Sequence, residues 1–317
     1  MPTLLPELPR PVIDEFARRP VVGEHRLCGL DIFSDAALID LLDRFPREHL
    51  YARSMGSDPL RGEENLLALH DGVGGAELLQ AVRKGRLWLN LTRVDRADAA
   101  CRRVILGLYE ELRAQVPGFV PDAGQGTLLI SSPHALVYYH ADGPASVLWH
   151  LRGRKRVWVY PALDPRYMPR ELLEDIFAGA RDEYLPYQTA FDAGAEVFDL
   201  EPGQWIAWPQ NAPHRVTNLD SVNVSLSTEH FTRAGRRRFQ VYVANRFFRT
   251  RLGWGHLSAR EDGALALAKT VVQRLARKLG LDPVQLNRNV ATLRVLADAP
   301  GGVVALPARQ ASAAPES

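Results

Sequence analysis

The first 125 residues combine helix-like and strand-like spacing of apolar positions. After Ser34, a residue type that caps helix N-termini, apolar residues recur every three or four positions until Pro46 ends the run. Residues 87–94 alternate leucine with polar or aromatic side chains, which is typical of a β-strand. An amphipathic helix is predicted over 96–115. Residues 1–125 are therefore expected to form a mixed α/β region that packs on the rest of the molecule.

Short apolar runs separated by glycine and proline fill residues 126–235. Eight such runs in so short a stretch are typical of a sandwich or barrel. We therefore expect a mainly β protein with α additions, for whose core a jelly-roll is a natural choice. The expected strands are 127–131, 135–141, 145–151, 154–160, 196–200, 204–208, 214–217 and 222–228.

An insertion, residues 161–195, interrupts these strands. It contains a helical pattern over 170–177 and the tyrosines Tyr167, Tyr184 and Tyr187. Long insertions in compact domains commonly form lids or binding loops. We expect this one to cover a substrate site.

The chain after the β-rich core is expected to add a basic strand and helices over 236–297. Basic residues alternate with apolar and aromatic ones over 236–251, which indicates the strand. Helical patterns follow over 261–279 and 283–296. The Ala-, Pro-, Gly- and Ser-rich residues 298–317 are expected to be a disordered tail.

Composition and charge narrow the class of protein. The chain has 317 residues, of which 46% are hydrophobic and 24% charged, as in ordinary globular proteins. A net charge of +2 argues against a general nucleic-acid or membrane-surface binder. Two cysteines, Cys28 and Cys101, fit a reducing compartment. Without a secretory signal pattern or a long apolar run, we expect a cytoplasmic protein with no membrane segment.

The pair His140 and Asp142 offers two metal ligands on one face of a predicted strand, because residues i and i+2 point to the same side. A Pro-Gly turn at 202–203, a strand and a loop lead to His214, which can lie opposite this pair. Two histidines and one carboxylate form the facial triad of non-haem iron oxygenases. With nine histidines and 37 acidic residues, one His-x-acid pair is expected by chance, so the pair alone carries little weight.

Lys155 adds a second feature to the candidate site formed by the two histidines and Asp142. Lysine is rare in this chain, and strand alternation places Lys155 on the same face as the apolar Val157 and Val159. An ammonium on an apolar face requires an anionic partner, because burying an unpaired charge is costly. That partner is either a carboxylate of the same chain or that of a bound ligand.

The last predicted strand has a polar face formed by Asn223, Ser225 and Ser227. These side chains either face the interior and contact a ligand or belong to a solvated edge strand. On a neighbouring strand, His150 joins the pocket only if the intervening turn adds no bulge. The sequence leaves both questions open.

Together these motifs resemble the cupin-like branch of the Jumonji C oxygenases, which is related to the asparaginyl hydroxylase of hypoxia-inducible factor. The family pattern is His-x-Asp/Glu, a Gly-x-Lys strand, a Pro-Gly turn and a second histidine. Its positions are filled here by His140 and Asp142, Gly153 and Lys155, Pro202 and Gly203, and His214. The resemblance covers residues 126–232. It implies a double-stranded β-helix enzyme with the iron ligands His140, Asp142 and His214, in which Lys155 binds the distal carboxylate of 2-oxoglutarate.

One position departs from the family pattern. Many relatives have a threonine three residues before the first histidine as a second 2-oxoglutarate contact, whereas this chain has Val137. The hydroxyl of Tyr138, Tyr139 or Ser131 is a candidate replacement, and Asn223 is a further candidate contact.

The resemblance implies a dioxygenase that uses Fe(II), 2-oxoglutarate and dioxygen, hydroxylates a protein or peptide side chain rather than a small molecule, and releases succinate and CO₂. Demethylation needs the same machinery and stays open. One alternative is a non-enzymatic cupin-like regulator or ligand sensor, which Val137 and the basic stretch 233–251 favour. Another is a cupin enzyme that uses a different metal without 2-oxoglutarate, which Lys155 disfavours.

Two surface features bear on partners. The arginines of 233–251 could contact nucleic acid, but the balanced overall charge favours a solvated basic face, and nucleic acid is not expected. The first C-terminal helical pattern carries an apolar stripe. This stripe either packs on the core or, as in relatives of the family, forms a homodimer through the C-terminal helices. Its residues are Leu265, Val272, Leu275 and Leu279.

Overall fold

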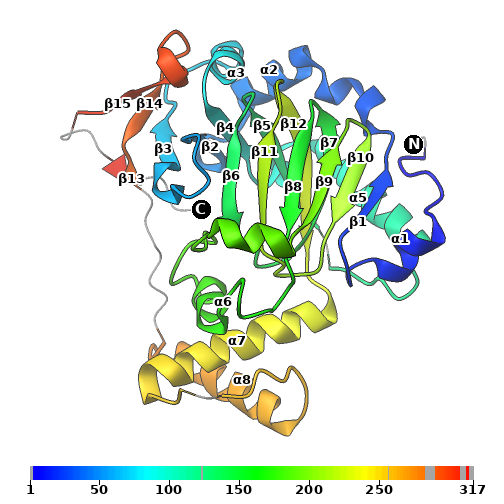
Figure 1. Cartoon of the computed structure of the whole chain (residues 1–317), viewed down its shortest axis with the longest axis vertical. Coiled ribbons are helices and arrows are strands. Elements are labelled where there is room, and N and C mark those ends of the chain that lie inside the picture. Colours follow the sequence, from blue (N-terminus) through cyan, green and yellow to red (C-terminus); the bar gives the residue numbers. More distant parts are fainter. Residues whose placement is uncertain (1–2, 123, 256, 283–289, 308–311, 314–317) are drawn as a thin grey trace.

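Two β-sheets face each other in the centre of the molecule (Figure 1). The computed structural model describes residues 3–122, 124–255, 257–282, 290–307 and 312–313. The large sheet runs, in spatial order, β1 (Val21–Glu24), β10 (Gln204–Ala207), β7 (Ala145–Arg152), β12 (Asn223–His230), β5 (Gln125–Ser131), β4 (Leu87–Leu91), β2 (Leu50–Ser54), β3 (Leu66–Leu69), β14 (Leu293–Val295) and β15 (Val303–Ala305). The small sheet runs β6 (Leu136–His140), β11 (His214–Asn218), β8 (Lys155–Val159) and β9 (Glu196–Leu200). Two further strands, β13 (Val290–Ala291) and β16 (Ser312–Ala313), pair with each other.

The helices of the described chain lie around these sheets. They are α1 (Arg10–Glu15), α2 (Asp35–Arg44), α3 (Gly75–Lys84), α4 (Val94–Ala97), α5 (Ala99–Gln115), α6 (Arg170–Phe177), α7 (Arg233–Leu252) and α8 (Ala264–Lys278). Three-residue 3-10 turns and a longer one, η5 (Thr189–Gly194), connect some of the elements.

All eight strands expected in the β-rich region are present, as β5 to β12, with ends shifted by at most two residues. The two sheets pack through apolar side chains on their facing sides. Leu148 and Ile206 of the large sheet belong to one buried cluster with Val157, Val159 and Val216 of the small sheet. This packing follows from the period-two alternation of the strands, which places every second side chain between the sheets.

The large sheet continues into the N-terminal region, because β4 pairs with β5 and β1 pairs with β10. Helices α2, α3 and α5 cover the other face of this sheet. Their buried leucines, among them Leu38, Leu78 and Leu108, form a single core with Leu89 of β4 and Leu128 of β5. The first 125 residues therefore share one hydrophobic core with the β-rich region.

The N-terminal helices follow the predicted caps with one difference. The Oγ of Ser34 accepts a hydrogen bond from the N–H of Ala37 at the start of α2, as predicted. The single helix expected over 96–115 is instead divided at Asp98. The Asp98 carboxylate accepts a hydrogen bond from the N–H of Cys101 at 2.7 Å, so a new helix begins there.

The insertion 161–195 packs on the outer face of the small sheet, and its helix α6 has the predicted bounds. Asp192 of η5 anchors it. The Asp192 carboxylate accepts hydrogen bonds from Arg215 of β11 at 2.6 Å and from the hydroxyl of Tyr187 at 2.7 Å. The Arg215 guanidinium also lies 3.5 Å from the centre of the Trp158 ring. These contacts fix the insertion to the strand that begins with His214.

The insertion also extends the small sheet at the edge formed by β6. The N–H of Ala141 donates to the carbonyl oxygen of Glu183 at 3.1 Å, and the N–H of Leu185 donates to that of Tyr139 at 3.0 Å. Residues 182–184 are thereby placed beside the end of β6 that carries the His-x-Asp pair.

The basic strand expected over 236–251 is wrong, because this stretch lies within the helix α7. The Oγ1 of Thr232 accepts a hydrogen bond from the N–H of Gly235 and caps the helix, and Gly253 ends it with a φ of 69°. The buried residues of α7 include the unbroken run from Val241 to Asn245, because both α6 and α8 pack on this helix. The β-branched and aromatic residues suggested a strand, but the caps at Thr232 and Gly253 mark a helix.

The expectations for the C-terminal residues also need correction. Residues 283–289 of the second predicted helix lie outside the described residues, but 290–295 form β13 and β14 rather than helix. β14 pairs in parallel with β3, whose edge offers free hydrogen-bonding groups. The tail expected to be disordered contains β15, which pairs with β14. Residues 308–311 and 314–317 lie outside the described residues.

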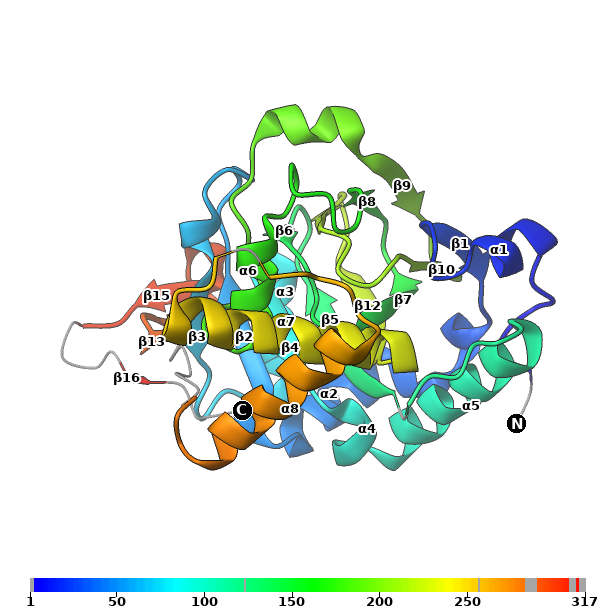
Figure 2. The ribbon, with the colours of Figure 1, turned by 90° about the horizontal axis from the view of Figure 1, so that it is seen from below.

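Helices α6, α7 and α8 stack in this order at one end of the molecule (Figure 1), and seen from that end they lie in front of the sheets (Figure 2). The residues that α8 buries are Ala266, Lys269, Thr270, Gln273 and Ala276. The predicted apolar stripe does not pack on the core, because Leu265 is 61% and Leu279 73% exposed. In the part of the chain that the structure describes, no helix is long and apolar enough to cross a membrane.

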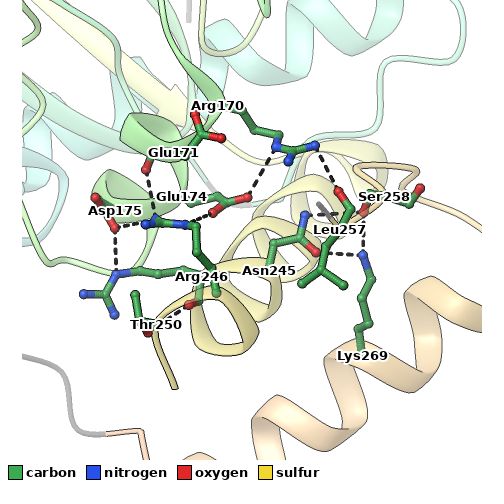
Figure 3. A network of polar contacts seen from close by, with 11 residues as sticks. Arg170, Glu171, Glu174, Asp175, Asn245, Arg246, Thr250, Leu257, Ser258 and Lys269 are labelled. Atoms are coloured by element: carbon green, nitrogen blue, oxygen red, sulfur yellow. Dashed lines mark hydrogen bonds and ion pairs between the residues drawn. The ribbon is translucent and has the colours of Figure 1, made fainter. Parts of the chain in front are cut away.

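A polar network joins these three helices (Figure 3). Glu174 of α6 is 2% exposed, and its carboxylate accepts a hydrogen bond from Nε of Arg249 on α7 at 2.8 Å. The Nε of Arg170 lies 3.5 Å from the other oxygen of Glu174. Lys269 of α8 donates to the Oδ1 of Asn245 on α7 at 2.7 Å. Buried polar side chains therefore hold both α6 and α8 against α7.

We predict that Glu174→Ala lowers the free energy of unfolding by about 1–3 kcal/mol, because it leaves Arg170 without its carboxylate partner and Arg249 with Asp175 alone. Urea denaturation measures the effect. The control is Glu171→Ala on the same helix, whose exposed side chain makes no ion pair among the described residues, with an expected change within about 0.5 kcal/mol. Equal effects of the two variants would contradict a role for the buried carboxylate.

Candidate metal and cosubstrate site

His140, Asp142 and His214 come together at one end of the space between the sheets. The pairing of β11 with β6 places His214 directly opposite His140. The Nε2 of His140 lies 3.5 Å from Oδ1 of Asp142, and the Nε2 of His214 lies 3.7 Å from Oδ2 of the same residue. One ligand atom from each of the three residues lies within 4.8 Å of the others. A single metal ion can therefore contact all three side chains.

The hydrogen bonds of both histidines leave Nε2 free to bind a metal. The Nδ1 of His140 lies 2.7 Å from the carbonyl oxygen of Tyr138, and the Nδ1 of His214 lies 3.0 Å from that of Ala212. Because a carbonyl oxygen only accepts, each Nδ1 carries a proton, and in the neutral imidazole Nε2 then presents the lone pair. Such backbone contacts also fix the ring orientation of metal-binding histidines.

The charge state of the site also fits a cation. Burial lowers the pKa of His214 to about 4, so its imidazole is neutral at physiological pH. The Oγ of Ser146 donates to Oδ2 of Asp142 at 2.7 Å and orients the carboxylate. Two imidazole lone pairs and a carboxylate pointing at one another repel unless a cation lies between them. Two histidines and one carboxylate form the donor set that non-haem Fe(II) takes, with further coordination positions left free.

Lys155 lies in the same cavity as the triad. The cavity has a volume of about 370 Å³ and is lined by residues of both sheets and of the insertion. Lys155 is 4% exposed, and burial lowers the pKa of its ammonium to about 7. Its Nζ donates to the Oγ of Ser225 at 2.9 Å, and among the described residues it forms no ion pair. A buried ammonium without a carboxylate beside it suits an anionic ligand.

Three other predicted contacts are not part of the cavity wall. A register shift in β6 places both Val137 and His140 on the cavity side and turns Tyr138 away, where its hydroxyl accepts a hydrogen bond from the N–H of Gly56. The hydroxyl of Ser131 accepts a hydrogen bond from the side chain of Asn218. Asn223 donates to a backbone carbonyl. None of these three side chains lines the cavity that contains Lys155 and the triad.

The polar face of the last predicted strand turns inward. β12 lies between β5 and β7, so the alternative of a solvated edge strand is wrong. Ser227 lines the cavity and pairs in register with Thr127, another cavity residue. His150 is fully buried and hydrogen-bonds to Ser225. The strands that flank β12 decide which of its faces is buried. The sequence of β12 alone does not show which strands these are.

Sequence reasoning missed the carboxylates beside the triad. Glu229 of β12 and Glu183 of the insertion line the cavity together with Asp182. Burial is the larger cause, and the negative charge of Asp142 the smaller one, that together raise the pKa of Glu229 to about 7. The same two causes raise the pKa of Glu183. In the sequence, only their positions pointed to them. Glu183 lies in the insertion expected to cover the site, and Glu229 lies two residues after Ser227 and so on the same strand face.

Comparison with known proteins gives similarity in structure alone. No family model and no curated protein matches the sequence. An X-ray structure of *E. coli* YcfD superposes with a TM-score of 0.52 at 16% identity, over 98% of this chain and 89% of that one. YcfD in complex with cobalt and 2-oxoglutarate gives a TM-score of 0.47 at 16% identity, over 86% of this chain and 67% of that one. The first superposition establishes that this chain shares the fold of YcfD.

We predict that Asp142→Ala weakens binding of Co(II) at least about 100-fold, because it removes the carboxylate that both histidines face. Visible absorption of the Co(II) complex and calorimetry measure the affinity. Asp182→Asn is the matched control, because Asp182 lines the same cavity outside the triad, and its Co(II) affinity should stay within about threefold of wild type. Wild-type affinity in Asp142→Ala would mean that the triad is not the metal site.

Proposed function

We propose that this protein is an Fe(II)- and 2-oxoglutarate-dependent oxygenase of the Jumonji C type. The observation that carries the proposal is the presence, in one cavity, of a two-histidine, one-carboxylate triad and a buried lysine that has no acidic partner among the described residues. The strand order supports a double-stranded β-helix, in which β10, β7, β12 and β5 form one half and β9, β8, β11 and β6 form the other. A regulator that only binds a ligand has no need for three metal ligands with open coordination positions.

His140, Asp142 and His214 would hold the iron. The bound iron would supply the activation of dioxygen, so that 2-oxoglutarate, O₂ and a substrate C–H become succinate, CO₂ and a substrate C–OH. The chain positions the reactants and limits the access of water. Trp208 packs against the His214 ring, with the ring centres 4.4 Å apart, and Tyr184 of the insertion lies near His140.

Lys155 would bind the distal carboxylate of 2-oxoglutarate, a charge-assisted contact that also sets the orientation of the molecule. Val137 lines the cavity and has no hydroxyl. Thr127 and Ser227 lie side by side on the large sheet and line the same cavity, so they are better placed than Tyr138 or Ser131 to supply the second contact.

The substrate would be a side chain of a protein or peptide. YcfD, which has the same fold, is a ribosomal oxygenase. Asp182, Glu183 and Glu229 line the cavity near the metal ligands, and a cationic side chain beside these acidic groups would favour their ionised forms, so they suit a basic peptide better than an acidic one. Both cysteines are free, which agrees with a cytoplasmic location.

The proposal is tested by anaerobic titration of Fe(II) and then 2-oxoglutarate, read from the visible charge-transfer absorption of the chelate. We expect a saturable band in the wild type and none in His140→Ala. Lys155→Ala should retain metal affinity and lose about 30-fold or more in 2-oxoglutarate affinity, because a charged hydrogen bond is worth about 2 kcal/mol. Lys84→Ala, at an exposed lysine, is the control for lost charge.

Metal binding without the band would contradict the oxygenase and favour a ligand sensor or an enzyme that uses another metal. An unchanged 2-oxoglutarate affinity in Lys155→Ala would overturn the role of that residue alone.

We also propose that the protein forms a homodimer through α8. Besides Leu265 and Leu279, four more large apolar side chains of this helix are 44–66% exposed: Leu267, Val271, Val272 and Leu275. Such a contiguous apolar surface marks an interaction site, and one helix face can pair with its own copy about a twofold axis. The buried, mostly polar face of α8 is already occupied by α7.

Light scattering coupled to size exclusion should give a dimer for the wild type and a monomer for Leu275→Glu, because the charge would be buried in an apolar interface. Leu106→Glu on α5, where the side chain is similarly exposed at 50% compared with 55% for Leu275, should stay dimeric. A wild-type monomer at micromolar concentration would refute the proposal.

A further inference from the structure

The ammonium of Lys155 has a single hydrogen-bond acceptor among the residues that the structure describes, the Oγ of Ser225 at 2.9 Å. Lys155 begins β8, and Ser225 lies on β12 of the facing sheet. An ammonium carries three N–H groups, so two donors remain without a protein acceptor. Whatever fixes the Ser225 hydroxyl therefore also fixes the direction of the other two donors.

The Ser225 hydroxyl is fixed by His150 of β7. The Nδ1 of His150 lies 3.0 Å from the Oγ of Ser225, and its Nε2 lies 2.8 Å from the carbonyl oxygen of Gly153. Because the carbonyl only accepts, Nε2 carries the proton and Nδ1 is an acceptor. Ser225 must then donate to His150 and accept from Lys155. All hydrogen bonds in this series have one direction, from Lys155 through Ser225 to His150 and on to the Gly153 carbonyl.

Two features keep this series from reversing. His150 is fully buried, and burial together with the nearby Lys155 charge lowers its pKa to about 3, so its Nδ1 remains an acceptor at any physiological pH. Gly153 has a φ of 81°, and a Cβ at this position would lie 2.6 Å from the carbonyl oxygen of Val222. Only glycine fits, so the β7–β8 turn holds the terminal acceptor in one place.

We propose that Ser225 and His150 are positioning residues that hold the Lys155 ammonium by one N–H and present its other two to a carboxylate of the bound ligand. The identification of that ligand as 2-oxoglutarate rests on the proposed function. Neither residue lines the cavity, so both act through Lys155. His150, which the sequence left as an open candidate for the pocket wall, lies one layer behind it.

This arrangement predicts a pH signature. Loss of the Ser225 oxygen removes the only acceptor that stabilises the charged form of Lys155, so the lysine should lose its proton at lower pH. A dicarboxylate binds the charged form of Lys155. As the pH rises, the affinity for the dicarboxylate should therefore begin to fall at a lower pH in a variant that lacks the Ser225 oxygen than in the wild type. The titratable groups on the elements packed around Lys155 are His150 on β7, Glu229 on β12 and His214 on β11, with Asp142 farther along the cavity.

The chain is suited to a direct measurement, because lysine occurs at only four positions, Lys84, Lys155, Lys269 and Lys278. Selective ¹³C labelling of lysine gives one Cε signal for each of them, and Lys155→Ala assigns the buried one. We would follow this signal against pH in the metal-free protein and measure 2-oxoglutarate affinity of the Zn(II)-loaded protein by calorimetry. The first measurement needs neither iron nor turnover.

In Ser225→Ala we expect the midpoint of the Lys155 titration to fall by about one pH unit and 2-oxoglutarate affinity to fall about tenfold at neutral pH, with Zn(II) affinity unchanged. Ser225→Thr, which keeps the hydroxyl, should restore both. His150→Phe should shift both in the same direction as Ser225→Ala. Ser132→Ala is the matched control, because this serine is equally buried and its two hydrogen bonds lie outside the cavity.

An unchanged Lys155 titration and unchanged affinity in a folded Ser225→Ala protein would overturn the inference while the proposed function stands. If the wild type binds Zn(II) but no 2-oxoglutarate, the proposed function fails, and the titration of Lys155 still tests the hydrogen-bond series. Should Ser225→Ala fail to fold, Ser225→Thr and His150→Phe decide the question.

Discussion

The position of β11 between β6 and β8 is the constraint on which the site depends. This pairing alone brings His214 opposite His140 and Asp142, and it places Val159 on the other side of His214. A shift of one residue would turn His214 to the outer face, because side chains alternate along a strand. That outer position is taken by Arg215, which is enclosed by the insertion. The ion pair outside the sheet and the candidate metal-binding triad inside it therefore require the same register.

The cavity separates two kinds of charge. Lys155 provides a buried cation that is stabilised by a neutral hydroxyl rather than by a carboxylate. The acidic residues Glu183 and Glu229 lie near Asp142, where a bound metal would offset their repulsion. If a carboxylate of the chain had neutralised Lys155, no charge would remain for an anionic ligand. The unpaired lysine is thus the feature that most clearly distinguishes a ligand site from a structural ion pair.

The parts of the chain outside the double sheet have separate roles. The insertion adds a backbone segment to the edge of β6 and supplies part of the cavity wall. Helices α7 and α8 form a separate layer, joined to the insertion by the buried carboxylate of Glu174 and its arginine partners.

The sequence by itself determined the strands of the β-rich region and predicted the candidate metal-binding triad. Alternation identified all eight strands of the β-rich region, and the spacing of His140, Asp142 and Lys155 needed no knowledge of distant contacts. Only the tertiary structure decided what depends on which segments become neighbours. It showed that β12 is an interior strand, that α7 packs between α6 and α8, and that a register shift turns Tyr138 out of the cavity. The hydroxyl that fixes Lys155 also comes from the facing sheet, and a pattern along one strand carries no information about the strand that lies across from it.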